Sequence, residues 1–217
     1  MAESGTGLTL KGTLRMPSCI MLDVDGVLIN GRPRDGASWA TSLREDLGVD
    51  PTGLQQHFFK PFWKQVVTGQ LDIRDVLDQC LPRLGDGITT EQFMQYWFKN
   101  DARLDESVLA DCVALRDRGL KIVLATNQEH QRANYIMSTL KLADYVDGIV
   151  YSADIGVAKP DPAFFTAAMT KTQQPAHEHI LIDDTLENVK AAIAAKWSGR
   201  VWDSRKNLSD ILDDVRA

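Results

Sequence analysis

The chain of 217 residues has little cysteine, no excess of positive charge and no long apolar run. Its three cysteines, at positions 19, 80 and 112, show no paired spacing, so we expect reduced core thiols, not disulfides or a zinc site. Because the net charge is −6, neither nucleic acid nor an anionic membrane surface is expected as the main partner. No stretch is long enough to span a bilayer, and residues 1–17 lack the apolar segment of a signal peptide. These absences predict a globular protein of the reducing cytoplasm.

The composition is ordinary for a globular protein, with 44% hydrophobic and 25% charged residues. The length is sufficient for one sizeable core, or for one core with a small inserted module. Because the chain contains no evident repeat or low-complexity tract, its organisation must be inferred from the order of apolar and helical patterns.

Five short apolar runs have the pattern of buried strands, because each ends in turn-forming or polar residues. They lie at 19–24, 120–126, 147–152, 179–183 and 199–203, and the run at 147–152 is the weakest. Helical patterns fill the intervals, at 105–118, about 129–140, 162–171 and 186–196. Strands that alternate with helices of this length predict an α/β fold with a parallel sheet covered on both faces.

One interval interrupts this alternation. Between Gly31 and Asn100 there is no clear buried strand, and a loop of this length is uncommon inside a compact domain. We therefore expect a small α-helical module after the first strand, with helices near 37–48, 54–67, 73–84 and 90–98. Its aromatic residues are expected to form its own core, although some of them could face the main domain across a cleft: Phe58, Phe59, Phe62, Trp63, Phe93, Tyr96, Trp97 and Phe98.

Two aspartates, Asp23 and Asp25, follow the first predicted strand in the sequence CIMLDVDGVLIN. Burying carboxylates at a strand end is costly unless another group compensates for their charge. One explanation is a simple turn, because Asp25-Gly26 is a common hairpin dipeptide. The other is a site for a hard cation, and the pair alone does not decide between them.

Further polar residues follow the other predicted strands. Thr126 and Asn127 end the run at 120–126, and Asp183 and Asp184 end the run at 179–183. Lys159 precedes a predicted helix in the sequence GVAKPDP. All of these residues are predicted to lie at or near the carboxyl ends of strands.

Each of these residues also has an ordinary local explanation. Thr126 with Glu129, and Asp184 with Glu187, match the capping box of a helix N-terminus. Lys159 taken alone would be a solvated surface charge. The local explanations weaken when the positions are considered together, because a chance scatter of polar residues would populate both edges of the sheet.

In an open parallel sheet, the carboxyl ends of the strands form the edge where ligands bind. Ionised Asp23, Asp183 and Asp184 could together bind Mg²⁺, which takes carboxylate oxygens and keeps several waters. The Thr126 hydroxyl, and the N–H groups of the helix expected after it, suit phosphate oxygens. Lys159 adds a positive charge for the same anion.

The motifs DVDGV, ATN, AKPDP and IDD, in this order, resemble the four motifs of the haloacid dehalogenase-like hydrolase superfamily. The resemblance extends from about Cys19 to the C-terminus, and the helical insertion matches the α-helical cap of many small phosphatases of that superfamily. It implies a Rossmann-like core at residues 18–32 and 101–217, a cap at 33–100 and an N-terminal extension at 1–17. It also implies Mg²⁺ dependence and phosphoryl transfer through an aspartyl-phosphate.

By this resemblance Asp23 is the nucleophile, and a carboxylate needs no base to deprotonate it at neutral pH. Asp25 would protonate the leaving oxygen and then take a proton from the hydrolytic water. Thr126, Asn127 and Lys159 would bind the phosphate. Lys159 would also offset the repulsion between the anions, so its removal is expected to impair catalysis severely without unfolding the protein.

The metal ligands implied by the resemblance are Asp23, the backbone carbonyl of Asp25, Asp184 and, directly or through a water, Asp183. The chain departs from the superfamily in two places. The last motif is a bare DD without a further acidic residue close behind it. Lys196 occupies a position where relatives often have glycine.

The expected activity is hydrolysis of a small phosphorylated metabolite, for example a sugar phosphate. A dehalogenase is disfavoured because a halide leaves without a proton, whereas Asp25 suits an alkoxide leaving group. A phosphotransferase or phosphomutase with the same core residues stays open, since it would differ only in how far the cap excludes water. A non-catalytic receiver-type phosphoacceptor is disfavoured, because in those domains the acceptor aspartate comes later than the acidic pair. The sequence makes no prediction about oligomeric state.

Overall fold

The computed structural model describes residues 17–204 and 207–213, so nearly all of the predicted N-terminal extension lies outside the described residues. A five-stranded parallel sheet in the order β3-β2-β1-β4-β5 forms its centre. The strands are β1 (Cys19–Leu22), β2 (Lys121–Thr126), β3 (Gly148–Tyr151), β4 (His179–Asp183) and β5 (Ser198–Val201). This arrangement confirms the predicted α/β, Rossmann-like core.

The order of the strands places a topological switch point at β1. The chain first adds β2 and β3 on one side of β1, and then returns to the other side for β4 and β5. The strands are in step, because Leu22 lies opposite Leu124 and Ile182. The residues after β1 and β4 therefore emerge side by side, and the Asp23 N–H donates to the Ile182 carbonyl at 3.0 Å.

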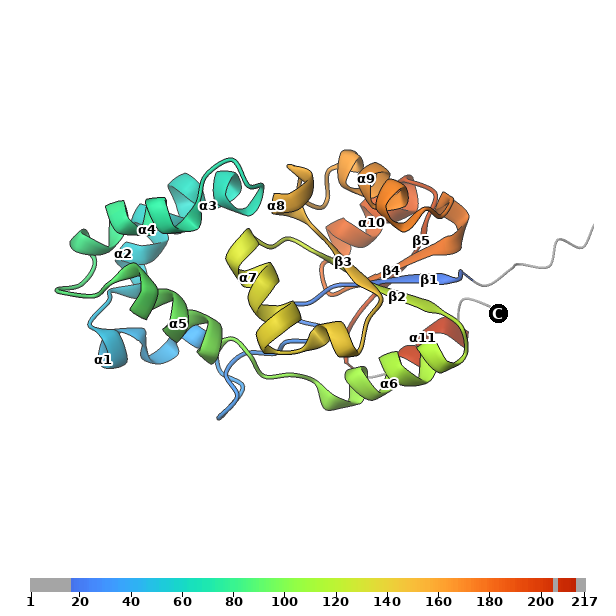
Figure 1. Ribbon diagram of the computed structural model, residues 1–217, viewed down its shortest axis with the longest axis horizontal. Coiled ribbons are helices and arrows are strands. Elements are labelled where there is room, and N and C mark those ends of the chain that lie inside the picture. Colours follow the sequence, from blue (N-terminus) through green and yellow to red (C-terminus); the bar gives the residue numbers. More distant parts are fainter. Residues whose placement is uncertain (1–16, 205–206, 214–217) are drawn as a thin grey trace, which may run out of the picture.

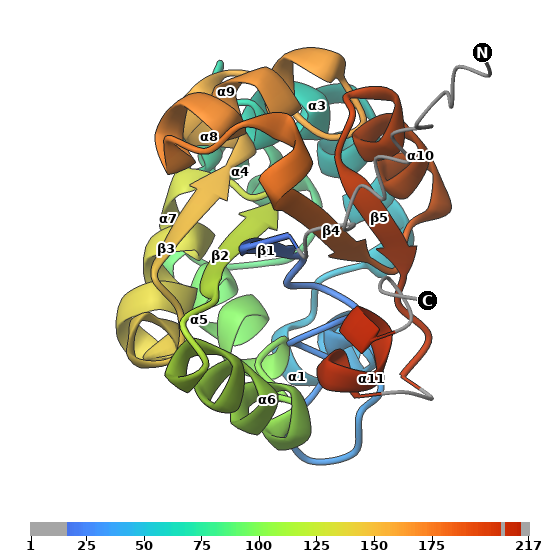
Figure 2. The same ribbon diagram turned by 90° about the vertical axis from the view of Figure 1, so that its right-hand side faces the viewer.

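Helices cover both faces of the sheet (Figure 2). On one face lie α6 (Glu106–Asp117) and α11 (Leu208–Asp213), and on the other α9 (Pro162–Thr172) and α10 (Leu186–Ala194). Alternate strand residues serve the two faces, since successive side chains of a strand point in opposite directions. The α6 face receives Ile20, Leu22, Ile122, Leu124, Ile180 and Ile182, and the α9 face Cys19, Met21, Val123, Ala125 and Leu181.

Between β1 and β2 the chain is helical and packs around a hydrophobic cluster of its own (Figure 1). Its elements are the helices α1 (Leu43–Leu47), α2 (Pro51–Leu54), α3 (Lys60–Val67), α4 (Ile73–Cys80) and α5 (Thr90–Asn100), with 3₁₀ helices at Trp39–Ser42 and Leu81–Arg83. A π-helix at Gln55–Phe59 joins α2 to α3. Of the eight aromatic residues expected in its core, four are buried in this cluster and four are partly buried and pack against it: Phe58, Phe93, Trp97 and Phe98, and Phe59, Phe62, Trp63 and Tyr96, respectively. Phe98 also contacts Tyr135 of the sheet domain, with ring centroids 5.3 Å apart.

The two capping boxes that offered a local explanation for Thr126 and Asp184 are not formed. Thr126 stays in β2, paired in register with Tyr151, and α7 (His130–Asn134) begins four residues later with Glu129 as its N-cap. The N-cap of α10 is Thr185, not Asp184. β2 includes Thr126 and β4 continues to Asp183, so both helices begin further along the chain than caps at Thr126 and Asp184 would place them. Asp161 is the N-cap of α9, because its side chain accepts a hydrogen bond from the Ala163 N–H, and Pro162 is the first residue of the helix.

The remaining sequence predictions concern cysteine and membrane spans. The three cysteines are buried and free, as expected. Within residues 17–204 and 207–213, no helix combines the length and the apolar character that crossing a membrane requires. The last strand ends at Val201, so Trp202 and Asp203 of the predicted run at 199–203 lie outside it.

Helix α10 ends in a Schellman motif, and Lys196 occupies its left-handed position, which favours glycine. Lys196 has φ 68°, in the left-handed region, and its N–H donates to the Ile193 carbonyl. The Trp197 N–H donates to the Ala192 carbonyl, and both side chains lie in the apolar cluster under α9. Glycine adopts this conformation without the steric penalty that a side chain brings.

We predict that Lys196→Gly raises the free energy of unfolding by about 1 kcal/mol, because the left-handed conformation is strained for lysine. Lys190→Gly is the matched control. Lys190 is an exposed residue inside α10, where glycine should lower the stability by about 1 kcal/mol. Urea denaturation of the three proteins measures both effects, and a loss of stability in the Lys196 variant would contradict the prediction.

Candidate active site

Three aspartates converge where β1 and β4 end. Asp23 and Asp183 are buried, Asp184 is exposed, and one carboxylate oxygen of each lies within 4.8 Å of the others. The in-step register of β1 with β4 brings them together, since Asp23 follows one strand and the acidic pair ends the other. Residues that are 160 positions apart in the chain thus form one acidic cluster, as the sequence motifs predicted.

A buried lysine lies against this cluster. The Nζ atom of Lys159 is 3.1 Å from Asp23 Oδ1 and 2.5 Å from Asp183 Oδ2, and the residue is 4% exposed. Burial opposes its charge, but the two carboxylates outweigh this effect and raise the pKa of Lys159. The lysine is therefore not the solvated surface charge considered above. Its burial adds a role in stability that the sequence did not indicate.

The backbone of Lys159 is held by Asn127. The Lys159 N–H donates to Asn127 Oδ1 at 2.8 Å, and Asn127 Nδ2 donates to the Lys159 carbonyl at 2.9 Å. The Lys159–Pro160 peptide bond is cis. Because both ends of its amide are engaged, the Asn127 side chain positions the lysine. The sequence had suggested instead that Asn127 binds the phosphate.

Asp183 is fully buried and both of its oxygens accept hydrogen bonds. Oδ1 accepts from the Thr185 N–H at 2.8 Å, and Asn188 Nδ2 reaches Oδ1 and Oδ2 at 3.1 and 3.0 Å. Oδ2 also receives the Lys159 ammonium. Asp183 thereby links the start of α10 to the lysine, and Asp184 is the more accessible member of the acidic pair.

Asp23 is almost completely withdrawn from water, with 8% of its surface exposed. Burial raises the pKa of Asp23 to about 7; Lys159 lowers it, and the charge of Asp183 adds to the increase. Three carboxylates facing one ammonium carry an excess of negative charge. A divalent cation would neutralise that excess and favour ionised Asp23, so the donor set suits a hard cation such as Mg²⁺.

Thr126 ends β2 beside this cluster and is 1% exposed. Among the residues that the structure describes, none forms a hydrogen bond with its hydroxyl, which therefore remains available to a ligand. The expected contribution from the following helix is reduced, because the Glu129 carboxylate accepts hydrogen bonds from the Gln131 and Arg132 N–H groups. Sequence analysis had assigned those N–H groups to phosphate.

Comparisons with known proteins agree with this geometry. A model of the haloacid dehalogenase-like hydrolase family matches residues 17–196. The chain belongs to this family. It is 28% identical to a phosphoglycolate phosphatase of Nitrosospira multiformis over 185 residues, which cover 81% of this chain and 78% of that protein. A phosphoglycolate phosphatase of Cupriavidus necator is 26% identical, over 84% of this chain and 80% of its own length.

Solved structures show the same fold. A HAD family enzyme from Bacteroides thetaiotaomicron, solved as a magnesium complex, superposes with a TM-score of 0.75 at 20% identity. The match covers 91% of this chain and 98% of that one. The family predicted from the four motifs is confirmed by the family model that matches residues 17–196.

In this hydrolase Asp25 lies at the border between the sheet domain and the helical segment. Its side chain is 53% exposed, and Gln128 Nε2 donates to Oδ2 at 2.5 Å. The nearest cation is Arg132, whose Nη2 is 4.0 Å from Oδ1. Loss of hydration raises the pKa of Asp25 to about 6, although Arg132 and the Gln128 hydrogen bond both lower it. An acid with this pKa can exchange protons near neutral pH.

Gln128 and Arg132 are contacts that sequence analysis missed. Arg132 is buried and also donates to the backbone carbonyls of Phe98 and Asp101, with an ion pair to the Asp101 carboxylate at 3.4 Å. The only local signal was their position, because both residues closely follow the Thr126 motif and their four-residue spacing suits one side of a helix. Their partners come from distant segments that the sequence does not place.

Besides the contact of Phe98 with Tyr135, hydrogen bonds from Arg132 and from Ser152 join the helical segment to the sheet domain. Arg132 holds the chain that leaves α5, through the carbonyls just described. The buried Ser152 hydroxyl at the start of α8 (Ser152–Ile155) donates to the Val67 carbonyl at the end of α3, at 2.5 Å. Figure 1 shows the corresponding contacts of the helical segment with α7 and α8. Asp25 thus faces the junction of the two units.

Gly26 allows Asp184 to approach the first motif. It has φ 81°, and a Cβ atom at this position would overlap the Asp184 carboxylate. Both constraints require glycine after Asp25. The hairpin-like turn and the acidic site, which were alternatives in the sequence, therefore coexist here.

We predict that Gly26→Ala displaces Asp184 and raises the dissociation constant for Mg²⁺ by about tenfold or more. Gly119→Ala is the matched control, because Gly119 also has a positive φ, 84°, but nothing lies within 4 Å of its added Cβ. Both variants should lose stability through backbone strain. Calorimetric titration with MgCl₂ measures the affinity, and equal values for the two variants would argue against the displacement of Asp184.

Proposed function

We propose that this protein is a Mg²⁺-dependent phosphomonoester hydrolase that acts on a small phosphorylated metabolite through an aspartyl-phosphate intermediate. The observation that carries the proposal is the position of Asp23 at the switch point of a parallel sheet, 3.1 Å from the Lys159 ammonium and with a carboxylate oxygen within 4.8 Å of one of Asp184. Anionic ligands of α/β proteins bind at this edge. The names of the relatives, phosphoglycolate phosphatases, support the reaction class and make phosphoglycolate the first compound to assay.

In the first step the Asp23 carboxylate attacks phosphorus, and the bond from phosphorus to the alkoxide oxygen breaks. Repulsion between two anions about 4 Å apart costs roughly 4 kcal/mol at an effective dielectric constant of 20. Lys159 offsets this repulsion, because its ammonium lies 3.1 Å from Asp23 and cannot escape into solvent. Thr126 contributes its unpartnered hydroxyl to a phosphoryl oxygen.

Asp23, Asp184 and the carbonyl of Asp25 would hold the Mg²⁺ ion. Asp183 would reach it through a water molecule, since both of its oxygens already accept hydrogen bonds. A bound Mg²⁺ would stabilise negative charge on the transferring phosphoryl group.

Asp25 acts as acid and base in the two halves of the reaction. Its carboxyl group donates a proton to the leaving oxygen, and its carboxylate then takes a proton from the water that attacks the aspartyl-phosphate. Free phosphate leaves and Asp23 is regenerated. Gln128 and Arg132 hold the Asp25 carboxyl group at the junction with the helical segment.

We also propose that residues 33–100 are a cap and that residues 18–32 and 101–217 form the catalytic core. The separate hydrophobic cluster of the helical segment supports this division. So does the pairing of its two connections, because Asn30 and Gly31 are hydrogen-bonded to Arg103. A cap at this border would cover the leaving group near Asp25 and limit the access of water.

The test is phosphate release from phosphoglycolate and a panel of sugar phosphates, with Mg²⁺ and with water as the only acceptor. Asp23→Asn should abolish turnover, because an amide is a poor nucleophile of nearly the same shape. Asp23→Asn should still fold, as judged by its circular dichroism spectrum. Phosphate transfer that requires an added phosphorylated acceptor would favour the phosphotransferase or phosphomutase alternative. Undiminished hydrolysis by Asp23→Asn would overturn the mechanism.

A second prediction separates the two roles of Lys159. Lys159→Met should lower kcat/KM by at least about 100-fold through lost stabilisation of the transition state. It should also lower the free energy of unfolding by about 3 kcal/mol, because two buried carboxylates lose their counterion. Mg²⁺ should recover part of this stability.

Lys171→Met is the control for the loss of an ion-paired lysine. Its ammonium pairs with Asp154 on the surface, where such a pair contributes little to stability. Thermal melts with and without MgCl₂, together with kinetics, compare the two variants. Equal losses of stability and of kcat/KM in the two variants would contradict the special position of Lys159.

A further inference from the structure

Two adjoining cavities open beside the loop that carries Asp25 and Gly26. One of about 480 Å³ is lined by Asp25, Trp39 and Asp101, among others. The second, of about 630 Å³, extends toward Trp202. Both cavities share Gly26, Asn30 and Arg103. Under the proposed mechanism the leaving group of the substrate lies at Asp25, and therefore in the first of these cavities.

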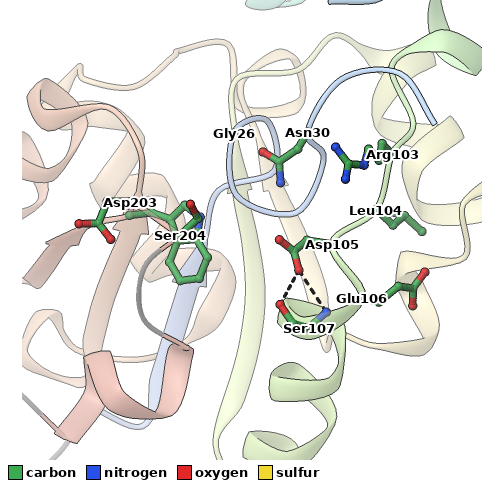
Figure 3. Close-up of a pocket in the computed structure, with 10 residues that line it drawn as sticks. Gly26, Asn30, Arg103, Leu104, Asp105, Glu106, Ser107, Asp203 and Ser204 are labelled. Carbon is green, nitrogen blue, oxygen red and sulfur yellow. Dashed lines mark hydrogen bonds between the residues drawn. The ribbon is translucent and has the colours of Figure 1, made fainter. Parts of the chain in front are cut away.

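The guanidinium group of Arg103 is the cation at the boundary of the two cavities. Figure 3 shows it extending toward Asn30 and the Gly26 loop. Within the part of the chain that the structure describes, the Arg103 side chain forms no hydrogen bond or ion pair. The other charged groups of the second cavity are directed elsewhere: Asp105 accepts hydrogen bonds from Ser107 as the N-cap of α6, and Glu106 and Asp203 point away.

The position of Arg103 is set by its backbone and by a glycine. Its N–H donates to the Gly31 carbonyl at 3.0 Å, and its carbonyl accepts from the Asn30 N–H at 2.9 Å. Gly36 has φ 73°, and a Cβ atom there would overlap the Arg103 guanidinium. The Arg103 backbone is therefore fixed by pairing with Asn30 and Gly31, and its side chain occupies space left open by Gly36.

The two carboxylates that line the first cavity, Asp25 and Asp101, both lie near Arg132. Asp101 is paired with Arg132 at 3.4 Å, and Asp25 lies 4.0 Å from the same arginine. Among the described residues that line this cavity, Arg103 is then the cation available to a ligand. Arginine binds a carboxylate with two parallel hydrogen bonds, which gives both affinity and orientation.

We propose that Arg103 determines specificity by binding a carboxylate on the alcohol portion of the substrate. The substrates would then be phosphate esters of small hydroxy acids. This inference rests on the proposed phosphatase function and identifies its substrate class. A neutral leaving group of similar size would occupy the cavity without neutralising the arginine and would be hydrolysed less efficiently.

The experiment compares matched esters with and without the carboxylate: phosphoglycolate against ethyl phosphate, and 3-phosphoglycerate against glycerol 3-phosphate. We expect the native enzyme to prefer the carboxylate member of each pair. Arg103→Gln should lower kcat/KM for the two esters that carry a carboxylate by about tenfold or more, mainly through KM. It should leave kcat/KM for the two esters of neutral alcohols (the neutral esters) within about twofold of the native value. Arg103→Lys should recover part of the loss, because it restores the charge without the bidentate geometry.

Arg118→Gln is the matched control, an exposed arginine at the end of α6 that lines neither cavity. It should behave like the native enzyme with all four esters. Equal changes for acids and neutral esters in Arg103→Gln, or a native preference for the neutral esters, would overturn the role of Arg103 while leaving the phosphatase function intact. Failure of the native enzyme to hydrolyse any phosphomonoester would overturn both.

Discussion

The structure depends on one buried ammonium group. Asp23 and Asp183 emerge from neighbouring parallel strands, and their carboxylates could not both be buried there without a counterion. Lys159 supplies it from the chain between β3 and α9, and Asn127 at the end of β2 holds the lysine backbone in place. The same contacts thus join the ends of three strands and place a buried positive charge where the proposed mechanism needs one. Stability and chemistry are linked here, since the charge that makes burial tolerable is also the charge that would meet a phosphate.

A second network, centred on Arg132, lies at the border with the helical segment. Arg132 joins α7 to the chain leaving α5 through two backbone carbonyls, and its guanidinium also lies near Asp25. Asp25 is therefore half-exposed but fixed, which is the combination that a proton-transferring group needs. The two cations act at different depths, Lys159 inside the sheet domain and Arg132 at its boundary. The boundary is where the helical segment could influence which leaving groups reach Asp25.

Much of this organisation could be predicted from the sequence because it depends on local patterns. Buried strands leave short apolar runs, and the helical segment is evident from the missing strand between Gly31 and Asn100. The capping box that offered a local explanation for Thr126 is not formed, for a physical reason. The spacing of Thr126 and Glu129 fits a helix start, but pairing of β2 with β3 keeps Thr126 in the sheet. Gln128 and Arg132 could not be identified because their partners lie far away in the sequence, and hydrogen bonds between distant segments leave no periodic signal.

The sequence alone determined the chemistry that is available: which carboxylates, which lysine and which threonine follow buried strands. It did so because strand ends and turn residues are encoded within a few neighbouring positions. Only the tertiary structure decided what each group does. It engaged the Asn127 amide on the lysine backbone and enclosed Asp183 in hydrogen bonds. It also placed the Arg103 side chain beside the cavity at Asp25 with no hydrogen-bond or ion-pair partner among the described residues. Electrostatic and hydrogen-bond partners are chosen by proximity in space, and proximity is established only when the whole chain has folded.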